Sequence, residues 1–85
     1  MNMTITVYTT ATCGYCHALK GWLRQRNVDY IERRVDLNPI AAQYMVQLSG
    51  QMGVPFTTVE QDGETEMIVG FNPQRFEQII QEKGE

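Results

Sequence analysis

The chain has little cysteine, little proline and no long apolar run. No segment approaches the ~18 consecutive apolar residues of a membrane-spanning helix, so we expect no membrane association. Seven basic residues stand against ten acidic ones, and the net charge is −3. Nucleic-acid binding is therefore not expected, because nothing would offset the phosphate charges. The first six residues carry no positive charge and start no apolar leader, which favours a cytoplasmic location.

The composition that remains is that of one folded domain. Of 85 residues, 42% are hydrophobic and 20% are charged, which is the balance of a soluble globular protein. A chain of this length builds one modest core. The sequence has no internal repeat, low-complexity segment or linker, so we expect a single domain over residues 1–85.

Apolar spacing and local start signals outline the secondary structure. Alternation among β-branched residues predicts a strand over residues 4–10, and apolar spacings of three and four residues predict helices. Asn38-Pro39 and Asn72-Pro73 each join a cap residue to a proline at the first helical position, and Thr12 is a candidate cap for the first helix. Asp62-Gly63 predicts a hairpin turn within a loop slightly longer than two residues. The expected strands are 4–10, 30–37, 55–60 and 66–69. The expected helices are 14–27, one from Pro39 with Gly50 as its stop, and one from Pro73 whose inner stripe is Phe76, Ile79 and Ile80.

This β-α-β-α-β-β-α order defines an α/β fold. The first strand-helix-strand unit is expected to be parallel and right-handed, and the last two strands form an antiparallel hairpin. A four-stranded mixed sheet with helices on both faces follows. Cys13 falls at the carboxyl end of the first strand, which is the edge where open α/β sheets place their chemistry.

The two cysteines, Cys13 and Cys16, form a C-x-x-C motif at the predicted helix start. A helix N-terminus has free N–H groups and a partial positive charge, so we expect it to lower the pKa of Cys13 and favour the thiolate. Cys16, one turn further on, can attack a mixed disulfide formed at Cys13 and release the reduced substrate. Gly14 would let a substrate backbone approach, and Tyr15 would give an apolar flank. The pattern predicts dithiol chemistry with Cys13 attacking and Cys16 resolving.

A second candidate element is Gly53-Val54-Pro55. Proline has no N–H, so the residue before it can expose free backbone groups. A cis bond between Val54 and Pro55 would turn that backbone toward the cysteine pair. The alternative is a proline that simply begins an edge strand.

Other interpretations of the cysteines remain open from the residues alone. Cys13 to His17 also spells C-x-x-C-H, the signal for c-type haem attachment, with His17 as one axial ligand and Met45, Met52 or Met67 as the other. A zinc site needs about four ligands, so zinc or an iron–sulfur cluster would have to be shared between two chains. A structural domain without catalysis is a further alternative. The simplest expectation for His17 is an exposed helix residue.

The motifs together resemble the glutaredoxin family over nearly the whole chain. The matching segments are Val7-Tyr8-Thr9-Thr10, Cys13-Gly14-Tyr15-Cys16, Gly50 to Pro55, and Val69-Gly70-Phe71-Asn72. The resemblance implies a thioredoxin-like fold, thiol–disulfide oxidoreductase activity, a cis Pro55, and a Val54 backbone that pairs with a bound thiol or peptide. It also implies a redox-active Cys13–Cys16 disulfide, no metal and no bound cofactor. The implied thiol-binding residues are Thr10, Gly14, Tyr15, Val54, Pro55, Gly70, Phe71 and Asn72.

The chain departs from glutathione-using members at the positions that carry charge. Thr10 stands where they usually have lysine, Met52-Gly53 stand where a basic residue is common, and Gly70 to Pro73 replace Gly-Gly-x-Asp. Because charge-assisted hydrogen bonds are the strong ones, these departures predict weak glutathione binding.

The same segments point to several electron donors. The Gly-Phe-x-Pro segment is similar to redoxins that serve ribonucleotide reductase, and Cys-Gly-Tyr-Cys is similar to mycoredoxins. The expected donors are therefore glutathione, another low-molecular-weight thiol such as mycothiol, or thioredoxin reductase with NADPH. The expected partners are disulfide-containing proteins, with ribonucleotide reductase among them, and the chain is expected to act as a monomer.

Overall fold

The computed structural model describes residues 3–84. Its elements are β1 (Thr4–Thr9), α1 (Gly14–Gln25), β2 (Ile31–Arg34), α2 (Pro39–Ser49), β3 (Phe56–Gln61), β4 (Glu64–Val69) and α3 (Pro73–Gly84). The strands form one sheet in the order β2-β1-β3-β4, with β1 and β2 parallel and the other pairs antiparallel. The predicted element order and the mixed four-stranded sheet are confirmed. None of the helices in the described range is long and apolar enough to cross a membrane.

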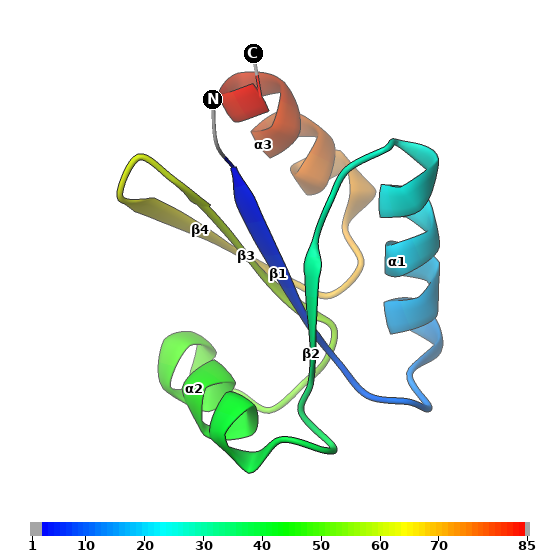
Figure 1. Ribbon diagram of the computed structural model, residues 1–85, viewed down its shortest axis with the longest axis vertical. Coiled ribbons are helices and arrows are strands. Elements are labelled where there is room, and N and C mark those ends of the chain that lie inside the picture. The colour runs from blue at the N-terminus through cyan, green and yellow to red at the C-terminus, as the bar shows by residue number, and fades with distance from the viewer. Residues whose placement is uncertain (1–2, 85) are drawn as a thin grey trace.

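Helices cover both faces of the sheet, as predicted (Figure 1). One buried cluster joins β1, β3 and β4 to α1 and α3, through residues Ile5, Val7, Leu19, Leu23, Val59, Ile68, Phe76 and Ile79. A second, smaller cluster lies under α2 and contains Tyr8, Ala41, Met45 and Phe56. The central strand β1 therefore buries side chains on both of its faces, and the loop that follows it is anchored at one end.

Local capping signals set the limits of α2. The Asn38 side chain accepts hydrogen bonds from the N–H groups of Ile40 and Ala41, each at 3.1 Å, and Pro39 occupies the first turn. Gly50 ends the helix with φ of 72°, a left-handed conformation that costs glycine little. Both boundary predictions are confirmed.

Three expectations about element limits were wrong. Residues 35–37 do not continue β2, because the N–H groups of Leu37 and Asn38 turn back to the carbonyl of Arg34. Helix α1 ends at Gln25 instead of residue 27. The hairpin turn holds only Asp62 and Gly63, both with positive φ, because Gln61 pairs with Glu64. The paired residues at these strand ends are polar, so the alternation of apolar residues could not indicate the pairing.

Candidate active site

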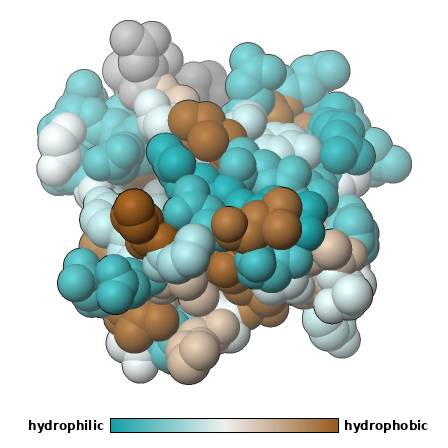
Figure 2. Space-filling model, turned by 60° about the horizontal axis from the view of Figure 1, so that its bottom comes forward, coloured by the Kyte–Doolittle hydropathy of each residue, from teal (hydrophilic) through white to brown (hydrophobic). Residues whose placement is uncertain are grey.

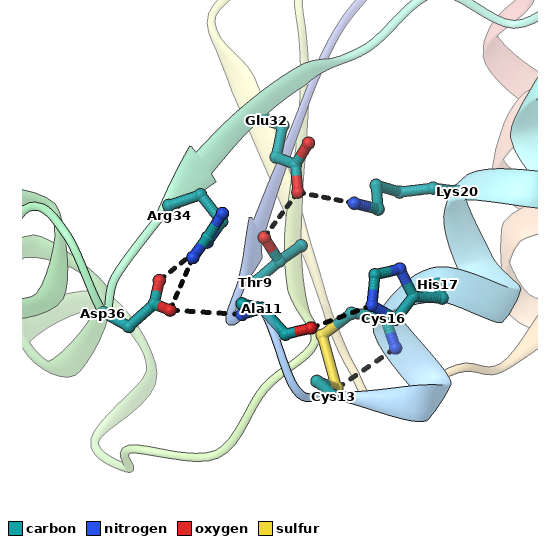
Figure 3. Close-up of polar contacts among 9 residues, drawn as sticks. All are labelled: Thr9, Ala11, Cys13, Cys16, His17, Lys20, Glu32, Arg34 and Asp36. Atoms are coloured by element: carbon teal, nitrogen blue, oxygen red, sulfur yellow. Dashed lines mark hydrogen bonds and ion pairs between the residues drawn. A yellow bond between two sulfur atoms is a disulfide. The ribbon is translucent and has the colours of Figure 1, made fainter.

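The cysteine pair lies where β1 passes into α1. Cys13 and Cys16 form a disulfide, with their Cα atoms 5.2 Å apart. Cys13 itself caps the helix in an extended conformation, and its Sγ accepts a hydrogen bond from the Cys16 N–H at 3.1 Å (Figure 3). The expected cap at Thr12 was therefore wrong, because the sulfur of Cys13 takes the place that a threonine oxygen would fill.

The two sulfurs differ in their access to solvent. Cys16 is fully buried beneath the first turn of α1, whereas Cys13 is only half-buried. No acidic residue lies in the first turn of α1 to oppose the positive end of the helix. When the disulfide is reduced, the Cys16 N–H and the helix end both favour a thiolate on Cys13. This asymmetry suits an attacking Cys13 and an enclosed, resolving Cys16.

The Val54-Pro55 segment lies against Cys13. Its peptide bond is cis, as the resemblance implied, and the Val54 carbonyl oxygen is 3.8 Å from Cys13 Sγ. The Gly70 N–H donates to the Pro55 carbonyl at 2.8 Å. Gly70 has φ of 82°, which places it in the region that other residues avoid. The segment around Val54 and Pro55 thus lies beside the half-buried sulfur of Cys13, and Gly70 binds that segment in turn.

The other predicted site residues differ in their contacts and in their exposure to solvent. The Thr10 carbonyl accepts the Cys13 N–H at 3.4 Å, and the space beside Gly14 is open for 4 Å. The Tyr15 side chain is 71% exposed. Phe71 is partly buried against the larger core cluster, while the Asn72 side chain accepts the Arg75 N–H at 3.2 Å and so caps α3. A direct role in thiol binding for these residues stays a prediction.

A polar network beside the disulfide was not found from the sequence (Figure 3). The buried Thr9 hydroxyl donates to Glu32 Oε2 at 2.7 Å, and Lys20 Nζ binds the same oxygen at 2.8 Å. On the other side of the loop, Arg34 pairs with Asp36 at 2.7 Å. No local signal links these residues, because sequence separations of 12 and 23 divide Lys20 and Thr9 from Glu32.

The network makes one prediction about acid stability. The hydrogen bond from Lys20 and then that from Thr9 lower the pKa of Glu32 from its ordinary value of 4.5. The stabilisation is present above the ordinary pKa and is lost as pH falls through the lowered folded pKa. We expect Glu32→Gln to reduce the loss of unfolding free energy between about pH 6 and pH 3, measured by urea denaturation. Glu60→Gln, which removes an exposed carboxylate on β3, is the control; equal flattening in both variants would contradict the assignment.

The fold and the dithiol at the strand-helix junction define a thiol–disulfide oxidoreductase of the thioredoxin-like class. A family profile described as glutaredoxin matches residues 5–64, which is more than half of the chain. The chain belongs to the glutaredoxin family.

Individual relatives agree with this assignment. An uncharacterised glutaredoxin-like 8.6 kDa protein of the rubredoxin operon in Clostridium pasteurianum is 34% identical over 91% of this chain and 97% of its own. Glutaredoxin 3 of Escherichia coli K12 is 35% identical over 60% of this chain and 61% of its own. The NrdH-redoxin structure from Escherichia coli superposes with a TM-score of 0.75 at 29% identity, over 89% of this chain and 93% of that chain.

Family membership decides how the C-x-x-C-H segment is interpreted. The two cysteines serve disulfide exchange, and the haem-attachment interpretation is not supported. His17 is exposed, as expected, and its ring Nε2 lies 3.0 Å from the Ala11 carbonyl oxygen. Within residues 3–84 no three His, Cys, Asp or Glu side chains gather as a metal site would require.

Proposed function

We propose that this glutaredoxin-family oxidoreductase reduces protein disulfides through both cysteines and binds glutathione weakly. The observation that carries the proposal is the pairing of the basic side chains near the site (Figure 3). Lys20 is bound to Glu32 at 2.8 Å, and Arg34 is bound to Asp36 at 2.7 Å. Each cation is already partly neutralised by a carboxylate, which weakens the charge-assisted bond that it could offer to glutathione.

The surface at this end of the molecule also favours a protein substrate. Hydrophobic patches lie among hydrophilic ones on the face that includes the β1–α1 loop and α2 (Figure 2). Tyr15, inside the cysteine motif, is 71% exposed, and Met52, in the segment that leads to Val54, is 79% exposed. Exposed apolar side chains next to a reactive group suit contact with another protein surface.

The reduction of a substrate disulfide proceeds by two successive thiol–disulfide exchanges. The Cys13 thiolate attacks one sulfur of the substrate disulfide, forms a mixed disulfide, and releases the first substrate thiolate. The Cys16 sulfur, having lost its proton, then attacks Cys13 Sγ and releases the second substrate thiolate. Two electrons pass to the substrate, and the Cys13–Cys16 disulfide remains. An external thiol reductant must supply two electrons to this disulfide before the next cycle.

We further propose that thioredoxin reductase with NADPH supplies those electrons. The Escherichia coli NrdH-redoxin, similar in fold at 29% identity, is described as having a thioredoxin-like activity profile. The resemblance of Gly70 to Pro73 to the redoxins of ribonucleotide reductase supports that enzyme as one substrate. A monomer in the reducing cytoplasm suits a C-x-x-C pair that turns over between thiol and disulfide.

The donor is tested by recharging the oxidised protein in two ways. NADPH with thioredoxin reductase should reduce it at least about tenfold faster than millimolar glutathione with glutathione reductase, a difference equivalent to about 1.4 kcal/mol. Insulin reduction gives the turnover rate. Thr10→Lys is the matched variant, since it restores a cation and should raise only the glutathione rate. Equal rates with both donors would refute the donor proposal; if both are slow, mycothiol is the next donor to try.

A further inference from the structure

The backbone of Ala11 is held at both its N–H and its carbonyl group (Figure 3). Its N–H donates to Asp36 Oδ2 at 3.1 Å, and its carbonyl oxygen lies 3.0 Å from His17 Nε2. Ala11 is exposed and stands two residues before Cys13 in the loop from β1 to α1. The Asp36 and His17 side chains hydrogen-bond to this loop and not to the sulfurs, so both act on the site through the loop.

Asp36 holds the backbone in place just beyond the end of β1. The parallel pairing of β1 with β2 ends at Thr9 and Arg34, and the Val35 N–H still donates to the Thr9 carbonyl at 3.0 Å. Past that point the Asp36 carboxylate, not a strand carbonyl, receives the Ala11 N–H. The side chain therefore fastens a loop that the backbone ladder no longer holds.

The Asp36 carboxylate is itself oriented by a neighbour. Arg34 Nε and Nη2 donate to its two oxygens, each at 2.7 Å, in the bidentate geometry that fixes a carboxylate plane. Arg34, and to a smaller extent the Ala11 N–H, holds the pKa of Asp36 well below its usual range. The carboxylate therefore remains charged wherever disulfide exchange proceeds.

His17 connects the Ala11 carbonyl to the first turn of α1. It follows the resolving Cys16 directly, and although its side chain is exposed, its ring reaches back to Ala11. Since a carbonyl oxygen only accepts, Nε2 is the donor and carries a proton. The backbone of Ala11 is thus fixed to the turn after β2 through Asp36 and to α1 through His17.

We propose that Asp36 and His17 are positioning residues that hold the loop before Cys13. Their task is to keep Cys13 at the helix cap, where the Cys16 N–H meets its sulfur at 3.1 Å. With this loop loosened, the thiolate spends less time at that N–H and at the positive helix end, so its pKa rises and its attack slows. The proposal rests on the oxidoreductase activity alone and holds whichever donor recharges the protein.

The test isolates the first exchange in a Cys16→Ser background, where Cys13 is the one thiol left. Thiolate absorbance near 240 nm follows the ionisation of Cys13. The probe is 2-hydroxyethyl disulfide, whose S–S bond breaks as Cys13 bonds to one sulfur and 2-mercaptoethanol leaves as the thiolate. Asp36→Ala and His17→Ala should each raise the Cys13 pKa and slow this reaction by about three- to tenfold.

The sign of the pKa change separates positioning from simple electrostatics. Removing a negative charge from the neighbourhood would by itself favour the thiolate and lower the Cys13 pKa. Asp36→Ala should raise it, and Asp36→Asn, which keeps an oxygen for the Ala11 N–H, should recover part of the rate. Because both side chains hold the backbone of the same residue, Ala11, the double variant should lose less than the product of the single losses.

The control is Glu66→Ala, which removes an ion pair with Arg75 at 3.0 Å between β4 and α3. It should leave both the Cys13 pKa and the attack rate unchanged. A Cys13 pKa that falls or stays constant in Asp36→Ala would overturn the proposal. A drop in unfolding midpoint without a change in Cys13 reactivity would overturn it as well, since Asp36 would then be only structural.

Discussion

Replacing Cys13 with serine should abolish disulfide reduction. Cys13 is the half-buried sulfur, and it sits at the N-terminal cap of α1 with the Cys16 N–H 3.1 Å away. A serine hydroxyl in this position is protonated at neutral pH and is a poor nucleophile toward sulfur. We expect the rate of insulin reduction to fall by on the order of 10³-fold or more.

Cys16→Ser should behave differently, because it removes only the second exchange. The variant should still attack substrate disulfides but stop at a mixed disulfide on Cys13. Intact mass spectrometry should show the substrate thiol attached to the Cys16→Ser chain and no adduct on the Cys13→Ser chain. Equal residual turnover in the two variants would contradict the roles assigned from the different burial of the two sulfurs.

Local signals were enough to predict most of the fold. The two Asn-Pro pairs mark the starts of α2 and α3, and Gly50 marks the end of α2. These signals act within a few residues, where backbone geometry and capping hydrogen bonds decide the structure. The C-x-x-C motif could likewise be placed at the junction of β1 and α1, because the elements on either side of it were predicted.

The surroundings of the cysteines depend on strand register, which the sequence pattern did not determine. Thr9 lies opposite Arg34 in the β1–β2 ladder, and this register brings Glu32 and Asp36 to the end of β1. Asp36 and Ala11 are separated by 25 residues, so no periodicity connects them. A register shifted by one residue would turn the β2 side chains to the opposite face. The network beside the disulfide therefore emerged only with the three-dimensional structure.

A large effect on stability is expected at Phe76, in the first turn of α3. Its side chain is fully buried between α3 and α1, with its ring centroid 5.9 Å from that of Trp22. Phe76→Ala should lower the free energy of unfolding by about 3–5 kcal/mol, a large part of the ~5–15 kcal/mol typical of a small domain. Urea denaturation followed by circular dichroism measures it, and Ile40→Ala, at a side chain 78% exposed on α2, should change it by less than about 0.5 kcal/mol. Only the loss of a buried ring leaves a cavity, and this cavity would lie between α3 and α1, the helix that carries Cys16. Equal losses of unfolding free energy in the two variants would therefore contradict the packing of α3 against α1.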